Sequence, residues 1–217
     1  MKTGALNYLE RKPTIQTDSP APLLVLLHGY GSNEADLFSF AAELPKSLHI
    51  VSLQAPHELS YNSYAWYSIN FDANQNKFSD LAEASISTAR IATFIQEFTA
   101  NPMVDANKVF LLGFSQGAIL SYGLALNSTK IHHVIALSGY LNEDLITGDP
   151  TKSPTDFFIS HGSMDQVIPV EWARKSPIYL KQQGLVCEYK EYPVGHGVHP
   201  QNFHDFKAWI LQRLQDS

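Results

Sequence analysis

Three residues of the types that carry nucleophilic catalysis occur in the chain in the order serine, aspartate, histidine. Ser115 lies in a G-x-S-x-G motif at residues 113–117, Asp165 follows a His-Gly pair, and His196 lies between two glycines. A serine hydroxyl is nearly inert at neutral pH, so an imidazole must take its proton and a carboxylate must orient that imidazole. We therefore expect Ser115, His196 and Asp165 to act as nucleophile, base and orienting acid.

The serine motif lies where an apolar run at residues 109–112 gives way to a second apolar segment. This pattern predicts a strand that turns sharply into a helix, with glycines on both sides of the serine so that the two elements pass closely. The chemistry also needs two donors for the developing oxyanion. We expect the backbone N–H groups of Gln116, directly after the serine, and of Tyr30, after the apolar run 23–27, to supply them.

Other residues of the same types compete for the roles of base and acid. His199 is the main rival to His196, but its valine and proline neighbours suit the entry to a helix better than an exposed turn. Asp149 and Asp156 come before a predicted strand, whereas the acid should follow one, so Asp165 is preferred.

The remaining histidines give no sign of a metal site. The chain contains nine histidines, yet none has the spacing of a zinc motif, so we expect neither a metal nor another cofactor. His28 and His161 each precede a glycine at a strand end, and we expect their rings to bind loop backbone near the site. The lone cysteine, Cys187, lies in a strand pattern and is expected to be inert.

The elements that must position these residues form an α/β pattern. Apolar runs spaced as strands occur at residues 23–27, 50–53, 109–112, 134–137, 157–160 and 187–192, after a first edge strand and a loop at 14–22. Apolar residues at helical spacing predict helices over 80–99 and after Pro200. We expect a mostly parallel central sheet with helices on both faces. At 217 residues, the chain is expected to form a single domain over 1–217.

With these motifs in place, the chain resembles the phospholipase/carboxylesterase family of α/β-hydrolases, which are relatives of acyl-protein thioesterases and lysophospholipases. The resemblance rests on residues 27–31, 65–67, 113–117, 161–165 and 195–196 and spans nearly the whole chain. It implies an α/β-hydrolase fold and a cofactor-independent serine carboxylesterase that works through an acyl-enzyme. Hydrolysis of thioesters or lysophospholipids by the same machinery stays open, as does, more remotely, a catalytically silent binding module.

Two residues depart from the family pattern. Ala118 stands where a glycine is usual, and Ser68 stands where an aspartate is common. These departures leave the catalytic residues alone and bear on the choice of substrate.

The segment 59–78 contains six aromatic residues among asparagines and serines. We expect a long loop beside the serine that forms a wall of an acyl-binding groove, because long aromatic loops are uncommon unless functional. Surface packing or a homodimer contact is the alternative. On the strength of the family resemblance, Trp66 and Ile168 are expected to contact the substrate.

Charge and composition limit the partners. The net charge is −6 with no basic cluster, which argues against nucleic acid or an anionic membrane as a partner. No apolar run approaches the roughly 20 residues that a membrane-spanning helix needs, so no stable membrane insertion is expected. A single cysteine and a start without an apolar signal core favour a cytoplasmic protein. The expected partner is a small-molecule or acylated substrate.

Overall fold

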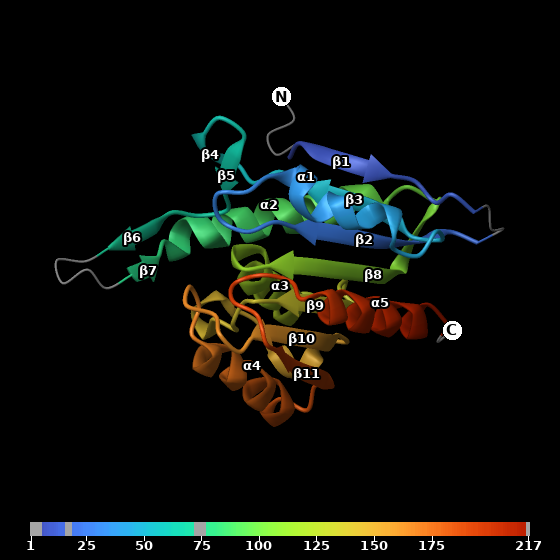
Figure 1. Ribbon diagram of the computed structural model, residues 1–217. Helices are drawn as coiled ribbons and strands as arrows, with labels where there is room; N and C mark the ends of the chain where they lie inside the picture. The colour runs from blue at the N-terminus through green and yellow to red at the C-terminus, as the bar shows by residue number, and fades with distance from the viewer. Residues whose placement is uncertain (1–5, 16–18, 72–76, 216–217) are drawn as a thin grey trace.

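The computed structural model describes residues 6–15, 19–71 and 77–215, and its centre is a seven-stranded sheet (Figure 1). The strands lie in the order β1-β3-β2-β8-β9-β10-β11. Their bounds are β1 Tyr8–Arg11, β2 Ala21–Leu27, β3 His49–Leu53, β8 Val104–Phe114, β9 His133–Leu137, β10 Asp156–Gly162 and β11 Cys187–Tyr192. Strand β1 pairs antiparallel with β3, whereas the other neighbours are parallel.

Five α-helices flank the sheet within the described residues: α1 Glu34–Phe38, α2 Leu81–Thr99, α3 Gln116–Leu126, α4 Val170–Gln182 and α5 Pro200–Gln215. Residues of α2, α3 and α4 pack in the apolar cluster on one face, and those of α1 and α5 pack in the cluster on the other. Strands β2 and β3 are almost wholly buried. The central strands are covered on both faces, which explains why they read as continuous apolar runs. The expected α/β-hydrolase architecture is confirmed.

Local sequence signals account for where two of these helices begin. The Asp80 side chain accepts a hydrogen bond from the backbone N–H of Glu83 at 3.0 Å and so caps α2, which begins at Leu81. Helix α5 begins at Pro200, whose missing N–H costs nothing in the first turn. Both predicted helices are confirmed.

The structure corrects the expected long aromatic loop at 59–78. This region contains two short antiparallel hairpins, β4 His57–Ser60 with β5 Ser63–Ala65, and β6 Ile69–Phe71 with β7 Lys77–Ser79, while residues 72–76 lie outside the described part. Strands of three or four residues depend on backbone hydrogen bonds more than on an apolar pattern, so little in the residue pattern predicts them. The expected loop at 14–22 is also shorter, because β2 already begins at Ala21.

The carboxyl ends of β2, β8, β10 and β11 lead into the segments that contain the predicted site residues. Parallel strands place such segments at one edge of the sheet, the usual location of ligand sites in open α/β sheets. Among the described residues, no helix combines the length and the apolar character that crossing a bilayer requires.

Candidate active site

Ser115 occupies the sharp turn between β8 and α3. Its backbone has φ 54° and ψ −115°, a strained conformation for a residue with a side chain. A Cβ on Gly117 would lie 2.0 Å from the carbonyl oxygen of Leu27, and one on Gly113 would lie 2.4 Å from Gly117 O. The two glycines are therefore required for the close passage of strand and helix that the motif predicts.

The structure brings Ser115, His196 and Asp165 together. His196 Nε2 lies 3.0 Å from Ser115 Oγ, and His196 Nδ1 lies 2.6 Å from Asp165 Oδ2. A carboxylate oxygen accepts, so Nδ1 carries the ring proton and Nε2 is free to accept the serine proton. This geometry suits proton transfer from the serine through a correctly oriented imidazole.

Asp165 is buried and surrounded by donors. Its Oδ1 accepts the backbone N–H groups of Val167 at 2.8 Å and Ile168 at 3.0 Å. Burial disfavours the charged form, but the hydrogen bonds from His196, Ile168 and Val167 outweigh it and leave the pKa of Asp165 below its usual value. The carboxylate therefore stays ionised where it holds His196.

Both expected oxyanion donors lie at the same cavity as the serine. Gln116 is the first residue of α3, a position whose N–H lacks an intrahelical partner. Tyr30 follows β2 and lines the cavity beside Ser115. The Gln116 side chain is held by the chain at 66–67, accepting from Trp66 N at 3.1 Å and donating to Tyr67 O at 2.8 Å.

The position of Trp66 contradicts the expectation that this residue contacts the substrate. The side chain is fully buried and is not among the residues that line the cavity. Its indole N–H donates to His28 O at 2.8 Å, and its ring lies 5.4 Å from the His28 ring between centroids. Trp66 thus supports the loop after β2 from behind, and its neighbour Tyr67 lines the cavity instead.

The cavity at Ser115 has a volume of about 260 Å³ and mostly apolar walls. It is lined by Tyr30, Tyr67, Ile69, Ser115, Gln116, Ile119, Tyr140, Val167, Ile168, Trp172 and His196. Ile168 therefore lies where it was expected.

Sequence reasoning missed several of the lining residues, among them Ile119, Tyr140 and Trp172. Trp172 lies on α4, a helix that the apolar pattern did not indicate, and Ile119 lies on α3, whose residues are all buried. Tyr140 follows the carboxyl end of β9, which was a usable signal, and packs edge-to-face against Trp172 at 5.2 Å.

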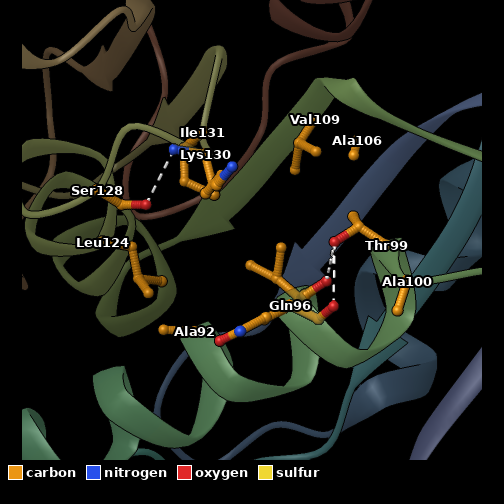
Figure 2. A pocket seen from close by; sticks show the side chains of 11 residues that line it. Ala92, Gln96, Thr99, Ala100, Ala106, Val109, Leu124, Ser128, Lys130 and Ile131 are labelled. Carbon is orange, nitrogen blue, oxygen red and sulfur yellow. Dashed lines mark hydrogen bonds between the residues drawn. The ribbon is translucent and has the colours of Figure 1, made fainter.

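A larger cavity, of about 420 Å³, lies between α2 and the segment from α3 to β9 (Figure 2). Its walls include Ala92, Gln96 and Thr99 from α2 and Leu124 from α3, with Lys130 beyond them. The described residues that line it include no histidine or carboxylate. It therefore lacks the means for the proton transfers that the cavity at Ser115 provides.

The two histidines expected to bind loop backbone do so. The His28 ring accepts from Ala55 N at Nε2, at 3.1 Å, and therefore donates from Nδ1 to Gly29 O at 2.8 Å. Burial lowers the pKa of His28. His161 Nε2 lies 2.9 Å from Ile168 O.

The competing residues have other contacts. His199 Nδ1 accepts from Gln201 N at 3.1 Å at the start of α5, the helix-entry position that its neighbours indicated. Asp156 contacts His133 at 2.6 Å and Arg213 at 2.9 Å. Asp149 caps the 3-10 turn Pro150–Lys152. These groups hold structure and lie outside the set that contacts Ser115.

Two further sequence expectations concern thiols and metals. Cys187 is partly buried, and burial raises the pKa of its thiol, which suits an unreactive residue. Within the part of the chain that the structure describes, no three histidine, cysteine or acidic side chains are grouped to hold a metal ion.

Comparison with known proteins shows which family the chain resembles over most of its length. Residues 13–213 match the family model described as Phospholipase/Carboxylesterase. An acyl-protein thioesterase 1 of Yarrowia lipolytica is 30% identical over 171 residues, covering 72% of this chain and 75% of the relative. An acyl-protein thioesterase 1 homolog of Dictyostelium discoideum is 24% identical over 96% of both chains. The Bacillus cereus carboxylesterase structure superposes with a TM-score of 0.79 at 17% identity, covering 97% of this chain and 95% of that one, which is a likeness of fold.

Proposed function

The chain belongs to the phospholipase/carboxylesterase family of hydrolases that act on ester bonds, and from this premise we propose that it is a serine carboxylesterase with an acyl-enzyme intermediate. The observation that carries the proposal is the continuous set of contacts from Ser115 Oγ through His196 to Asp165, at 3.0 and 2.6 Å. This set opens onto an apolar cavity that suits an acyl group.

In the first half of the reaction, Ser115 Oγ attacks the ester carbonyl carbon while His196 Nε2 takes the hydroxyl proton. The backbone N–H groups of Gln116 and Tyr30 stabilise the resulting oxyanion. The tetrahedral intermediate collapses to the acyl-enzyme, and His196 gives its proton to the departing alkoxide. Asp165 stabilises the imidazolium throughout this half-reaction.

In the second half, His196 removes a proton from water, and the hydroxide that forms attacks the acyl carbon. Collapse releases the carboxylic acid and returns the proton to Ser115 Oγ. The chain's own residues supply every proton transfer in the cycle, so the proposal calls for no cofactor.

A thioester is the second candidate substrate. The relatives from Yarrowia lipolytica and Dictyostelium discoideum carry the name acyl-protein thioesterase, and the same residues would protonate a departing thiolate. We take a small-molecule or acylated substrate as the partner in either case. A cytoplasmic site of action is part of the proposal, supported by the single cysteine, which cannot form an internal disulfide.

The test is covalent labelling together with kinetics. Ser115→Ala and His196→Ala should each lower kcat for a soluble ester by about 10⁶-fold, and Ser115→Ala should also abolish labelling by a fluorophosphonate, because these residues act as one unit. Asp165→Asn should cost about 10⁴-fold. Turnover of p-nitrophenyl esters and mass spectrometry of the labelled peptide give the two readouts.

The matched control is His199→Ala, which removes a nearby imidazole without touching the contacts of Ser115. Its activity should stay within a few-fold of the unaltered protein. A purified, folded protein that neither turns over esters and thioesters nor labels at Ser115 would exclude the enzymatic proposal in favour of a binding module.

A further inference from the structure

His161 is a buried histidine that the mechanism above does not use. It is the sixth residue of β10, and its side chain is fully buried. Strand alternation places it on the same face as Phe157 and Ile159, which belong to the cluster that α4 covers. From there its ring reaches the segment that contains the catalytic acid.

The contacts of the ring fix its tautomer. Nε2 lies 2.9 Å from the carbonyl oxygen of Ile168, which only accepts, so Nε2 carries a proton. Nδ1 is buried and has no hydrogen-bond partner among the described residues. A proton on Nδ1 would be a buried donor without an acceptor, which is costly, so the ring is neutral. His161 is thus a fixed Nε2–H donor.

The same N–H lies beside the carboxylate of Asp165. His161 Nε2 is 3.3 Å from Asp165 Oδ2, the oxygen that His196 Nδ1 contacts at 2.6 Å. The Nε2–H of His161 donates to Ile168 O, so its ring approaches Oδ2 without a hydrogen bond, while the other oxygen accepts the backbone N–H groups of Val167 and Ile168. The carboxylate is contacted on both oxygens, and its rotation is restricted.

We propose that His161 is a positioning residue for the catalytic carboxylate. Through Ile168 O it holds the loop that carries the acid, and its ring packs beside Oδ2, so it fixes where the carboxylate meets His196. The inference rests on the proposed function, since it assigns His161 a role in how readily His196 accepts the serine proton.

Other charges near His161 are already paired. Its register partner on β11 is Glu191, whose carboxylate binds Arg174 of α4 at 2.7 Å. The hydrogen bond from Arg174 is the main reason that the pKa of Glu191 lies below its usual value. The charged or titratable groups that face His161 are thus Asp165, His196 and this ion pair.

The test compares His161→Gln with His161→Asn. The amide nitrogen of glutamine is as many bonds from Cα as Nε2, whereas that of asparagine matches Nδ1, so only glutamine places a donor near Ile168 O. His161→Asn should lower kcat about 10- to 100-fold with little change in KM. His161→Gln should recover kcat to within about threefold, because its amide replaces the donor to Ile168 O.

Two measurements keep the outcome decisive. Nitrogen-15 NMR of the unaltered protein at pH 7 should show His161 with its proton on Nε2, and a proton on Nδ1 instead would overturn the inference even if His161→Asn fails to fold. A folded His161→Asn protein with unchanged kcat, or a glutamine variant as impaired as the asparagine variant, would also overturn it. If a fluorophosphonate does not label the unaltered protein at all, the proposed function itself is wrong, whatever the His161 variants show.

Discussion

At the scale of single residues, the walls of the cavity decide which acyl groups fit. The volume of about 260 Å³ is near the low end of ligand pockets, which typically measure roughly 300–1,000 Å³. Ile119 and Ile168 supply aliphatic wall, while Trp172, 45% exposed, lies where the cavity meets solvent. These dimensions favour short to medium acyl chains over long ones.

We therefore predict that kcat/KM rises up to about fourfold per added carbon, because each buried methylene contributes about 0.8 kcal/mol, and then falls once the cavity is full. Ile168→Ala should move the optimum to longer chains by enlarging the cavity. A series of p-nitrophenyl esters from acetate to laurate measures this.

Trp66→Phe is the matched control for this chain-length series. It removes the indole N–H that binds His28 O behind the cavity, so it should reduce activity on all chain lengths alike. The opposite result would be a flattened chain-length dependence in Trp66→Phe together with an unchanged optimum in Ile168→Ala. It would mean that Trp66, and not Ile168, forms the wall of the acyl site.

At the scale of elements, the turn that presents Ser115 depends on the approach of α3 to β2. We predict that Gly117→Ala destabilises the protein by more than about 3 kcal/mol or prevents folding, because its Cβ would lie 2.0 Å from Leu27 O, where backbone has to move. Urea denaturation measures the change in free energy of unfolding. Gly148→Ala is the control, since its Cβ would make ordinary contacts at 3.5 Å or more.

A Gly117→Ala protein with near-normal stability and activity would contradict this explanation of the turn. It would mean that α3 is free to shift away from β2 without disturbing Ser115.

The elements differ in how well the sequence predicted them, and burial explains the difference. Runs such as 109–112 predicted their strands because both faces of the sheet are covered, although β8 extends to Val104–Phe114 through polar residues. Helix α4 was missed because its buried face includes Ser176 and Pro177, which do not look like core residues. Ser176 is accommodated there by accepting a hydrogen bond from Leu141 N at 2.8 Å.

The residues of the site also differ in how well the sequence predicted them. The serine, acid and base were predictable because each needs a specific residue type after a specific strand. The direction of the Trp66 side chain was not, because an aromatic residue beside a site suits a cavity wall and a buried support equally well. Only the packing around His28 and Gln116 distinguishes the two.

At the scale of the whole molecule, acidic groups with depressed pKa values link stability to pH. The hydrogen bond from the Tyr192 hydroxyl, with others from Gln201 and Lys190, holds the pKa of Asp205 below its usual value, and those of Asp165 and Glu191 are lowered too. Such groups stabilise the fold above their unfolded pKa of about 4, and the contribution is lost as pH falls through the folded pKa.

We therefore predict that the urea midpoint declines gently from pH 7 to 5, because the pKa of buried His28 lies below its usual value, and falls steeply below pH 4. Asp205→Asn should be less stable at pH 7 and less sensitive to acid, because it lacks one of the carboxyl groups whose protonation is coupled to unfolding. Equilibrium unfolding at several pH values measures both effects. A midpoint that rises on acidification would contradict the assignment of these lowered pKa values.

The uneven burial of the tryptophans has an optical consequence. Of the three in the chain, Trp66 and Trp209 are 0% and 4% exposed, whereas Trp172 is 45% exposed at the mouth of the cavity. Two indoles thus emit from dry surroundings, and the third emits from a partly hydrated one. An acyl group that enters the cavity displaces water from Trp172 in particular, so the intrinsic fluorescence of the unlabelled protein contains a built-in reporter of occupancy.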